Sequence, residues 1–439
     1  MTDTLSYSFP CDFADLLREV WGNLMGGQYT PPPLPSALHL RNFLETMYFA
    51  SMETDEARPL QFTTCATPES IDVLHDDKTG PVEVWPFATD RHFNVQEIRR
   101  LSAATDIDSS AIWVRFPVNE REPLSIHGLV NFGSSWAYAR RGYQYHHDQI
   151  PHAFLLRAEG PGRLVAYQGR YRVAALIAGE VVRPEDVSIF DLRGAHPIFS
   201  EARDLLRPDV LPPQYETASE WHQFEWIAVI NVVLSIVNTI QQNGHGGALI
   251  LACRTCDLDD LLRMKYKLSQ ETSDLRRRFV HFLNLRHKHG DMVWPPQFKH
   301  GAPEVPEETV QLMATEIQEA QRRLTESCMF VGNLAGTDGA IVLGTDLKVR
   351  GFGAEILLDK AKPSKVYMVK DSLANTKEKG DSENFGMRHR SAMRLCGAAA
   401  GLAGFVVSQD GGVSLIWNDN GDSCYKSGVQ TTNANLVLA

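Results

Sequence analysis

The chain has 439 residues, of which 43% are hydrophobic and 22% are charged, and its formal net charge is -11 at pH 7. This length predicts two or three domains, each large enough to bury a core of its own. The acidic balance argues against an extended nucleic-acid surface, which carries an excess of Lys and Arg, but it permits a small nucleotide held by a local group of cations.

Two features of the sequence bear on its location. The first four residues lack the positive and apolar regions of a signal peptide. The most apolar stretch, residues 226–240, is shorter than the roughly twenty residues that a bilayer requires and contains Asn231 and Asn238. We therefore expect a cytoplasmic protein without a membrane segment, in which this stretch is a buried helix.

The seven cysteines are scattered along the chain. An odd, scattered set predicts reduced thiols. Cys253 and Cys256 form a Cys-x-x-Cys pair, but no second pair follows at zinc spacing and no helix clearly begins after the first cysteine. We interpret the two as residues that close a buried strand, in preference to a metal site or a redox pair.

Residues 1–212 predict an α+β domain with an antiparallel sheet. Apolar residues at helical spacing predict helices at residues 13–24 and 38–52. Short apolar segments separated by glycines are typical of antiparallel strands. These segments are residues 112–116, 124–129, 154–157, 163–168 and 171–177.

Residues 213–425 predict a second domain of α+β or α/β class, with a mixed sheet flanked by helices. A long apolar helix is expected at residues 220–242 and a buried strand at 248–252, followed by a mostly helical insertion at about 257–330. Beyond it the pattern is strand, strand, helix, strand, strand. These elements are residues 340–343, 349–356, 388–401, 404–408 and 413–417, and a polar tail without a strong pattern begins at Asn418, with residues 426–439 outside the domain.

A carboxylate stands on a glycine turn at Asp338, followed by Gly339 and an apolar run that begins at Ala340. The glycine permits a strained turn and the close approach of a ligand to the backbone. An aspartate there could bind a divalent cation or orient a ribose hydroxyl. The alternative is an ordinary turn residue, because Asp-Gly is a common turn dipeptide.

Two guanidiniums and an imidazole, Arg388, His389 and Arg390, follow Gly386 and Met387 at the start of an expected helix. Cations in a first turn oppose the helix dipole, which indicates that an anion lies between them. The alternative is a solvated basic corner of the protein.

The third segment is Ser408, Gln409 and Asp410, where an expected strand ends before a pair of glycines. A hydroxyl, an amide and a carboxylate stand there together. The alternative is a plain hairpin turn, which Asp-Gly favours.

In this order the three segments resemble the diadenylate cyclase (DAC) domain of DisA-type proteins, which carries Asp-Gly-Ala, Gly-Thr-Arg-His-Arg and Ser-Glu-Glu on a mixed sheet. Residues 245–251 are also similar to an early strand of that family, and the resemblance covers roughly residues 220–420.

The resemblance implies a nucleotidyltransferase that joins two ATP molecules into cyclic di-AMP with Mg²⁺ or Mn²⁺. Asp338 would serve the metal and the attacking 3′-hydroxyl, and Asp410 would be the second metal carboxylate. Arg388, His389 and Arg390 would hold the triphosphate and stabilise the leaving pyrophosphate. Further nucleotide contacts are implied for Gly339, Ala340, Gly386, Met387, His389, Ser408 and Gln409. Because one domain holds one ATP, a homodimer or higher oligomer is expected.

The chain departs from the family pattern at Met387, which replaces a threonine, and at Gln409, which replaces a glutamate. The loop at residues 360–384 and the insertion at 257–330 are also longer than expected. A second hypothesis is therefore a domain that binds ATP or a cyclic dinucleotide and signals to a downstream partner without turnover.

The N-terminal part resembles the predicted sensor domains that precede some DAC-like domains. Three segments carry this resemblance, residues 44–51, 58–62 and 124–129. It implies an N-terminal sensor that regulates the C-terminal domain, and it does not identify the sensor's ligand.

Overall fold

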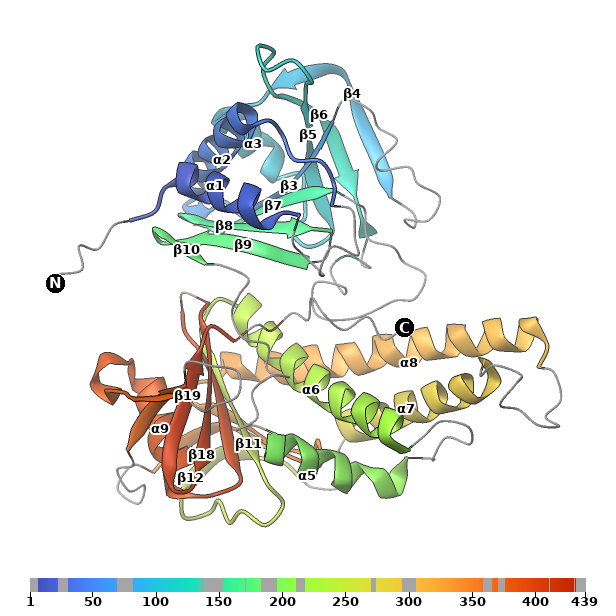
Figure 1. Ribbon diagram of the computed structural model, residues 1–439, viewed down its shortest axis with the longest axis vertical. Helices are drawn as coiled ribbons and strands as arrows, with labels where there is room; N and C mark the ends of the chain where they lie inside the picture. Colours follow the sequence, from blue (N-terminus) through green and yellow to red (C-terminus); the bar gives the residue numbers. More distant parts are fainter. Residues whose placement is uncertain are drawn as a thin grey trace. The chain divides into compact units, whose positions relative to one another are not determined.

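In the computed structural model the chain forms two compact units, Met1–Glu185 and Asp186–Thr431 (Figure 1). The boundary lies before the expected residue 212, because α5 (His196–Leu206) buries Phe199 and Ala202 in the core of the second unit. The structure describes residues 7–22, 31–68, 82–133, 136, 153–169, 171–182, 196–210, 218–269, 274–293, 305–357, 365–369, 376–409, 411–429 and 431.

The first unit is built on an eight-stranded sheet of order β10-β9-β8-β7-β3-β5-β6-β4, in which only β3 and β5 pair in parallel. Its strands are β3 (Phe62–Pro68), β4 (Glu83–His92), β5 (Ser110–Phe116), β6 (Ser125–Asn131), β7 (Phe154–Gly160), β8 (Arg163–Gln168), β9 (Tyr171–Ile177) and β10 (Glu180–Val182). Strands β1 (Thr54–Asp55) and β2 (Arg58–Pro59) form a separate two-stranded sheet and precede β3 in the sequence.

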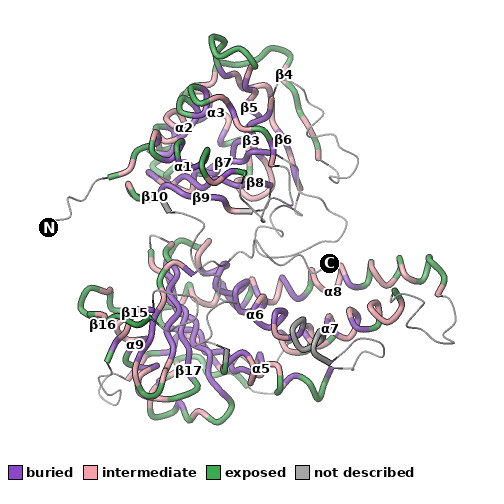
Figure 2. The backbone as a smooth tube through the Cα atoms, in the orientation of Figure 1, coloured by how far each residue is buried: buried purple, intermediate pink, exposed green. Residues whose placement is uncertain are grey.

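Three helices cover one face of this sheet: α1 (Pro10–Val20), α2 (Ala37–Ser51) and α3 (Val95–Ser102). Phe13, Phe43 and Ile98 from these helices pack with sheet residues such as Phe154 in one core. The opposite face carries a second cluster that includes Trp113 and Trp136. The burial colours of Figure 2 follow the same layers, with exposed residues on the outer helix faces. The predicted antiparallel sheet with helices is thus confirmed.

The second unit has a nine-stranded mixed sheet of order β12-β14-β13-β11-β17-β18-β19-β15-β16. Its strands are β11 (Gly247–Ala252), β12 (Leu262–Lys267), β13 (Ala340–Gly344), β14 (Val349–Ile356), β15 (Val366–Val369), β16 (Lys377–Lys379), β17 (Leu402–Val407), β18 (Val413–Asp419) and β19 (Asp422–Ser427). The pairs β11–β13 and β15–β19 are parallel, and all other pairs are antiparallel.

Helices flank both faces of this second sheet. One face packs against α5, α6 (Ala218–Gln242), α7 (Asp274–Val293) and α8 (Glu307–Asn333). The other packs against α9 (Met387–Ala398), which buries Met393 and Leu395 there. The expected mixed sheet with flanking helices is confirmed, and the apolar residues 226–240 form part of α6, largely buried as expected.

Three expectations need correction. Residues 257–330 are mostly helical as expected, in α7 and α8, but they also contain the unexpected strand β12, whose burial pattern is that of an edge strand with outward charges. The tail expected from Asn418 contains the end of β18 and all of β19, which pairs with β18. Cys253 and Cys256 form a disulfide, whereas reduced thiols were expected, because the turn that they bracket brings their sulfur atoms together.

None of the helices in the described part of the chain combines the length and the apolar character needed to cross a membrane.

Candidate functional site

The register of the second sheet brings the sequence segments singled out above to one edge. Ala340 on β13, Ala248 on β11 and Val406 on β17 stand in one row across the sheet. Since β13 and β11 begin at this edge and β17 ends there, Asp338 and Gln409 lie on the same edge. Because β11 lies between them, β13 and β17 are about 10 Å apart.

The first turn of α9 reaches the same edge. His389 Nε2 is 3.2 Å from Ser414 Oγ, and Ser414 on β18 pairs with Val406 in the row just described. A Cβ on Gly246 would stand 3.1 Å from Arg388 Nη1 and 3.2 Å from the backbone nitrogen of Gln409. Gly246, with φ of +65°, therefore leaves room for the Arg388 guanidinium where β11 and β17 meet.

Two opposite charges on this edge are available to a ligand. Asp338 and Arg388 are both exposed, and within the described residues neither side chain has a hydrogen-bond or ion-pair partner. The N-cap of α9 is Gly386, and the first turn holds no acidic side chain. Its first amide groups have no partner inside the helix and carry the positive end of the helix dipole. An anion at this position would meet both the guanidinium and the amides.

Arg390 and His389, in the same turn of α9, are held more tightly than Arg388. Arg390 Nη1 pairs with Glu383 Oε2 at 2.9 Å, with the two side chains 36% and 67% exposed. The His389 ring lies 5.4 Å from that of Phe385, so it is positioned by packing as well as by Ser414. Met387 is 75% exposed and contributes no polar group. Of the three predicted phosphate ligands, Arg388 is the most accessible.

The turn that carries Asp338 packs closely on β14. Gly339 has a φ of +112°, and a Cβ there would lie 2.6 Å from the carbonyl carbon of Gly353. A side chain at Gly339 would therefore clash with the neighbouring backbone. This close approach holds the Asp338 backbone in one place beside the sheet.

An aromatic pair that sequence reasoning missed stands beside Asp338. Tyr266 on β12 stacks on Phe352 of β14 with ring centroids 4.7 Å apart, and Lys265 Nζ lies 5.4 Å from the Tyr266 ring centroid. A Cβ on Gly353 would be 3.4 Å from Tyr266 Cδ2 and 3.5 Å from the Asp338 carbonyl oxygen. Tyr266 is 42% exposed. The sequence signal that could have predicted this strand, and so the place of Tyr266, is the alternation of apolar and charged residues in β12.

The end of β17 forms a tight turn. The Ser408 amide and hydroxyl both donate to the Gly412 carbonyl, at 2.9 and 3.0 Å. Gln241 of α6 donates to the Gly411 carbonyl at 2.6 Å and so ties the turn to the long helix. The Ser408 hydroxyl thus has a structural partner, whereas Gln409 is exposed.

Of the two predicted metal ligands, Asp338 and Asp410, the described residues include only Asp338. Asp410 lies outside them, and in the described part no group of three or more His, Cys, Asp or Glu side chains could hold a metal ion. Mg²⁺ bound with a nucleotide uses one or two carboxylates and completes its shell with phosphate oxygens and water. The exposed Asp338 fits that kind of site and does not suggest an all-protein metal cage.

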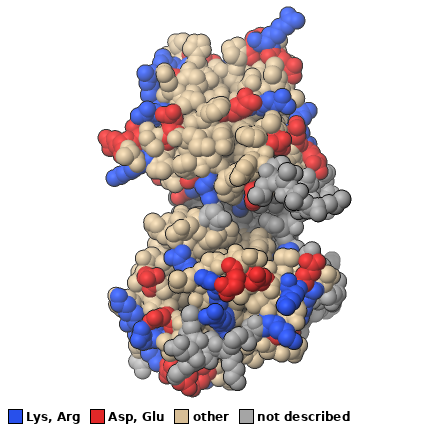
Figure 3. Space-filling view, turned by 90° about the vertical axis from the view of Figure 1, so that its left-hand side faces the viewer, with Lys and Arg blue, Asp and Glu red and all other residues tan. Residues whose placement is uncertain are grey.

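Charge on the surface is mixed. Figure 3 shows acidic and basic side chains interspersed on the face drawn there, without a continuous basic surface. This agrees with the net charge of -11. The cations at the start of α9 form a local feature, which suits a small anion better than a nucleic-acid strand.

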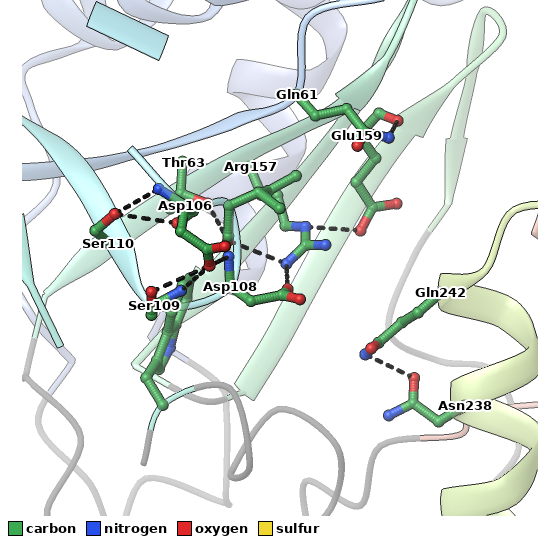
Figure 4. Close-up of polar contacts among 12 residues, drawn as sticks. Gln61, Thr63, Asp106, Asp108, Ser109, Ser110, Arg157, Glu159, Asn238 and Gln242 are labelled. Carbon is green, nitrogen blue, oxygen red and sulfur yellow. Dashed lines mark hydrogen bonds and ion pairs between the residues drawn. The ribbon is translucent and has the colours of Figure 1, made fainter. Parts of the chain in front are cut away.

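The first unit contains a buried polar cluster centred on Arg157 of β7 (Figure 4). Arg157 Nη1 is 2.7 Å from Asp108 Oδ1, and Nε is 3.3 Å from Glu159 Oε1. Burial alone would lower the pKa of Arg157, but the charges of Glu159 and Asp108 outweigh it and raise the pKa. The cluster joins the turn before β5 to β7, and both ion pairs of Arg157 lie within the protein, although its Nε donates no hydrogen bond to the described residues.

Residues 29–131 match the family model described as probable sensor domain DACNV. The match spans α2 to β6 of the first unit and is consistent with the expected DAC-associated sensor domain. It does not reach residues 220–420, for which the cyclase resemblance stays a prediction. No curated protein matches the chain.

Proposed function

We propose that the second unit binds ATP at the edge formed by Asp338, Arg388 and Gln409, and that two copies together condense two ATP into cyclic di-AMP. The observation that carries the proposal is the meeting of Asp338 and Arg388 on one sheet edge, with neither charge paired inside the described protein. The sensor domain at residues 29–131 would regulate this activity.

The arrangement suggests one pose for the nucleotide. The triphosphate would lie at the start of α9, where Arg388, the free amides and, after release from Glu383, Arg390 meet its charge. The ribose would lie toward Asp338, just before the neighbouring strand β13 at the same edge. The Tyr266 ring beside Asp338 is 42% exposed, and the base would stack on it in place of the Lys265 ammonium, because Phe352 stacks on the same ring.

A bound Mg²⁺ or Mn²⁺ would neutralise phosphate charge at this edge, with Asp338 and Asp410 as the protein ligands. In each of two steps the 3′-hydroxyl of one nucleotide releases its proton to solvent, its oxygen forms a bond to the α-phosphorus of the other, and the bond from that phosphorus to the pyrophosphate breaks. The protein's part is to place the reactants and to stabilise charge with Arg388 and Arg390.

The reaction joins two ATP molecules, and each copy of the second unit offers one site. Two copies are therefore required. Two copies facing each other around a twofold axis would bring the 3′-hydroxyl of each nucleotide to the α-phosphate of the other. A homodimer, or a higher oligomer built from such pairs, is therefore part of the proposal.

A second candidate function is nucleotide sensing without turnover. Met387 exposes an apolar chain, 75% accessible, where the resemblance implies a hydroxyl, and Gln409 puts an amide where it implies a carboxylate. In this alternative the unit binds ATP or a cyclic dinucleotide and signals to a downstream partner.

The test is incubation of the purified full-length chain with ATP and either Mg²⁺ or Mn²⁺, followed by product analysis with mass spectrometry. We expect cyclic di-AMP and pyrophosphate from the wild type, none from Asp338→Asn, and unchanged product from Asp274→Asn, an exposed aspartate at the start of α7.

If no product forms with either metal while ATP still raises the thermal midpoint, the sensing role replaces the cyclase role, because a ligand of the native state must stabilise it. If ATP also leaves the midpoint unchanged, the nucleotide site itself is wrong.

A further inference from the structure

We propose that Cys253 and Cys256 form a reversible dithiol–disulfide site, which is oxidised by low-molecular-weight disulfides and reduced by thiols. The two cysteines are bonded to each other in the structure. Cys253 directly follows β11, so the pair stands at the opposite end of that strand from Gly246. The proposal does not depend on nucleotide binding.

The surroundings of the pair leave room for sulfur. Gly401 has a φ of +75°, and a Cβ there would stand 3.0 Å from Cys253 Cβ and 3.3 Å from Cys256 Sγ. A larger residue at Gly401 would therefore be both strained and in contact with the pair. The Cys253 amide donates to the Gly401 carbonyl at 2.9 Å, which fixes the first cysteine against the turn between α9 and β17.

The two oxidation states make different contacts with this turn. Cys256 Sγ lies 3.1 Å from the Ala400 carbonyl oxygen. Only a thiol has a hydrogen to donate to that carbonyl, so at this distance the dithiol can form a hydrogen bond that the disulfide cannot form. The oxidation state of the pair therefore changes the hydrogen bonding of Ala400, two residues beyond the end of α9, the helix whose first turn contains Arg388.

Accessibility distinguishes this pair from most of the other cysteines. Cys253 is buried and Cys256 is half-buried, so Cys256 is the sulfur that a small oxidant reaches first. Cys65, Cys328, Cys396 and Cys424 are buried. Burial raises the pKa of Cys396 to about 12, which disfavours its reactive thiolate.

The chemistry balances with glutathione disulfide as the oxidant. The Cys256 thiolate attacks one sulfur of glutathione disulfide, which breaks that S–S bond, forms a mixed disulfide and releases one glutathione thiolate. The Cys253 thiolate then attacks Cys256 Sγ, which forms the intramolecular bond and releases the second. The protein loses two electrons, and the two protons of its thiols go to the two released glutathiones.

The position of Arg254 makes the test direct. Trypsin cuts after Arg254, between the two cysteines, so residues 255–263 stay attached to the preceding peptide only if the disulfide is present. The full-length protein is equilibrated in glutathione buffers of increasing oxidised fraction, alkylated, denatured and digested without reductant.

We expect the linked peptide to increase with the oxidised fraction, to disappear with dithiothreitol, to be absent in Cys256→Ser and to be unchanged in Cys11→Ser. We also expect amide exchange at residues 399–402 to differ between oxidised and reduced wild type and to be insensitive to redox buffer in Cys256→Ser. Free thiols throughout, a glutathione adduct on Cys256 that never resolves, or identical exchange in both states would each overturn the proposal.

Discussion

At the scale of single residues, the charges of the candidate site differ in how readily they can meet a ligand. Arg388 and Asp338 have no competing partner in the described residues, whereas Arg390 is paired with Glu383. Exposed ion pairs are worth at most about 1 kcal/mol. A triphosphate, with several charges, could therefore take Arg390 from Glu383.

The pairing leads to a prediction for Glu383→Gln. Without the competing carboxylate, Arg390 is available to phosphate, so ATP affinity should rise, by no more than about fivefold. Arg390→Ala should lower the affinity. Isothermal titration calorimetry of both variants measures the effect, and equal losses in the two would show that Glu383 itself supports binding.

Glu225 predicts a pH dependence of stability. Desolvation in α6 raises its pKa, and the positive charges of Arg207 and Arg203 only partly oppose this. A carboxyl group whose pKa is higher in the folded state favours folding when protonated. Its contribution is complete below the ordinary value of 4.5 and is lost as the pH rises through the raised pKa.

We therefore expect Glu225→Gln, which stays neutral, to have a higher thermal midpoint than the wild type at pH 8, and this advantage to shrink toward pH 4. Calorimetric scans across this range, with Glu316→Gln as a control on a different helix, measure the difference. A constant difference at all pH values would contradict the assignment of a raised pKa.

At the scale of elements, the turn from α6 into β11 controls the space for Arg388. Gly244 and Gly246 both have positive φ values, +69° and +65°, but only a Cβ on Gly246 would meet the Val407 carbonyl, at 2.9 Å, and Arg388. Backbone strain is therefore similar in the two alanine variants, while the steric consequence differs.

Gly244→Ala should cost about 1 kcal/mol of stability and leave ATP binding unchanged. Gly246→Ala should be less stable than Gly244→Ala and should bind ATP at least tenfold more weakly, as measured by thermal unfolding and titration. Equal ATP affinity in the two variants would show that Arg388 does not lie where the ligand binds.

In the first unit, the turn before β5 contacts Arg157, as Figure 4 shows. Asp108→Asn leaves a buried guanidinium with less compensation, which should destabilise the unit by about 2 kcal/mol when the partial exposure of Asp108 is allowed for. Glu53→Gln breaks an exposed pair with Arg99 and should have little effect. Calorimetry compares the two, and similar midpoints would contradict a structural role for Arg157.

Much of the fold could be predicted from the sequence, because long periodic segments carry their own signal. Strands β8, β9 and β14 have the expected bounds, and α2 and α6 differ by no more than two residues at either end. The edge strand β12 carries outward charges and has no apolar run, so its pairing with β14 decides its structure. Strand β19 follows Asn420 and Gly421, both with positive φ, a hairpin signal that was overlooked.

The candidate site was only partly accessible to the same reasoning. The charges at Asp338 and Arg388 were visible in the sequence, but their meeting depends on the register that aligns Ala340, Ala248 and Val406. Register is a property of the whole sheet. The neighbourhood of Tyr266 and Asp338 likewise needs three strands to be in place.

At the scale of the whole molecule, the chain joins a probable sensor domain to a unit with a candidate nucleotide site. If cyclisation needs two such units, product formed per molecule of protein should increase with protein concentration and level off once dimers predominate. Sedimentation velocity at the same concentrations gives the dimer fraction. Product formation by a species that stays monomeric throughout would contradict the two-copy mechanism.

The proposed function requires an anionic nucleotide to bind at the start of α9. Titration calorimetry with ATP tests it most directly when Arg388→Ala is compared with Arg394→Ala, an exposed arginine later on the same helix. A charge-assisted hydrogen bond is worth about 1.5–3 kcal/mol, so Arg388→Ala should weaken binding by about tenfold to one hundredfold while Arg394→Ala binds like the wild type. Equal affinities in the wild type and both variants would show that Arg388 does not contact the nucleotide.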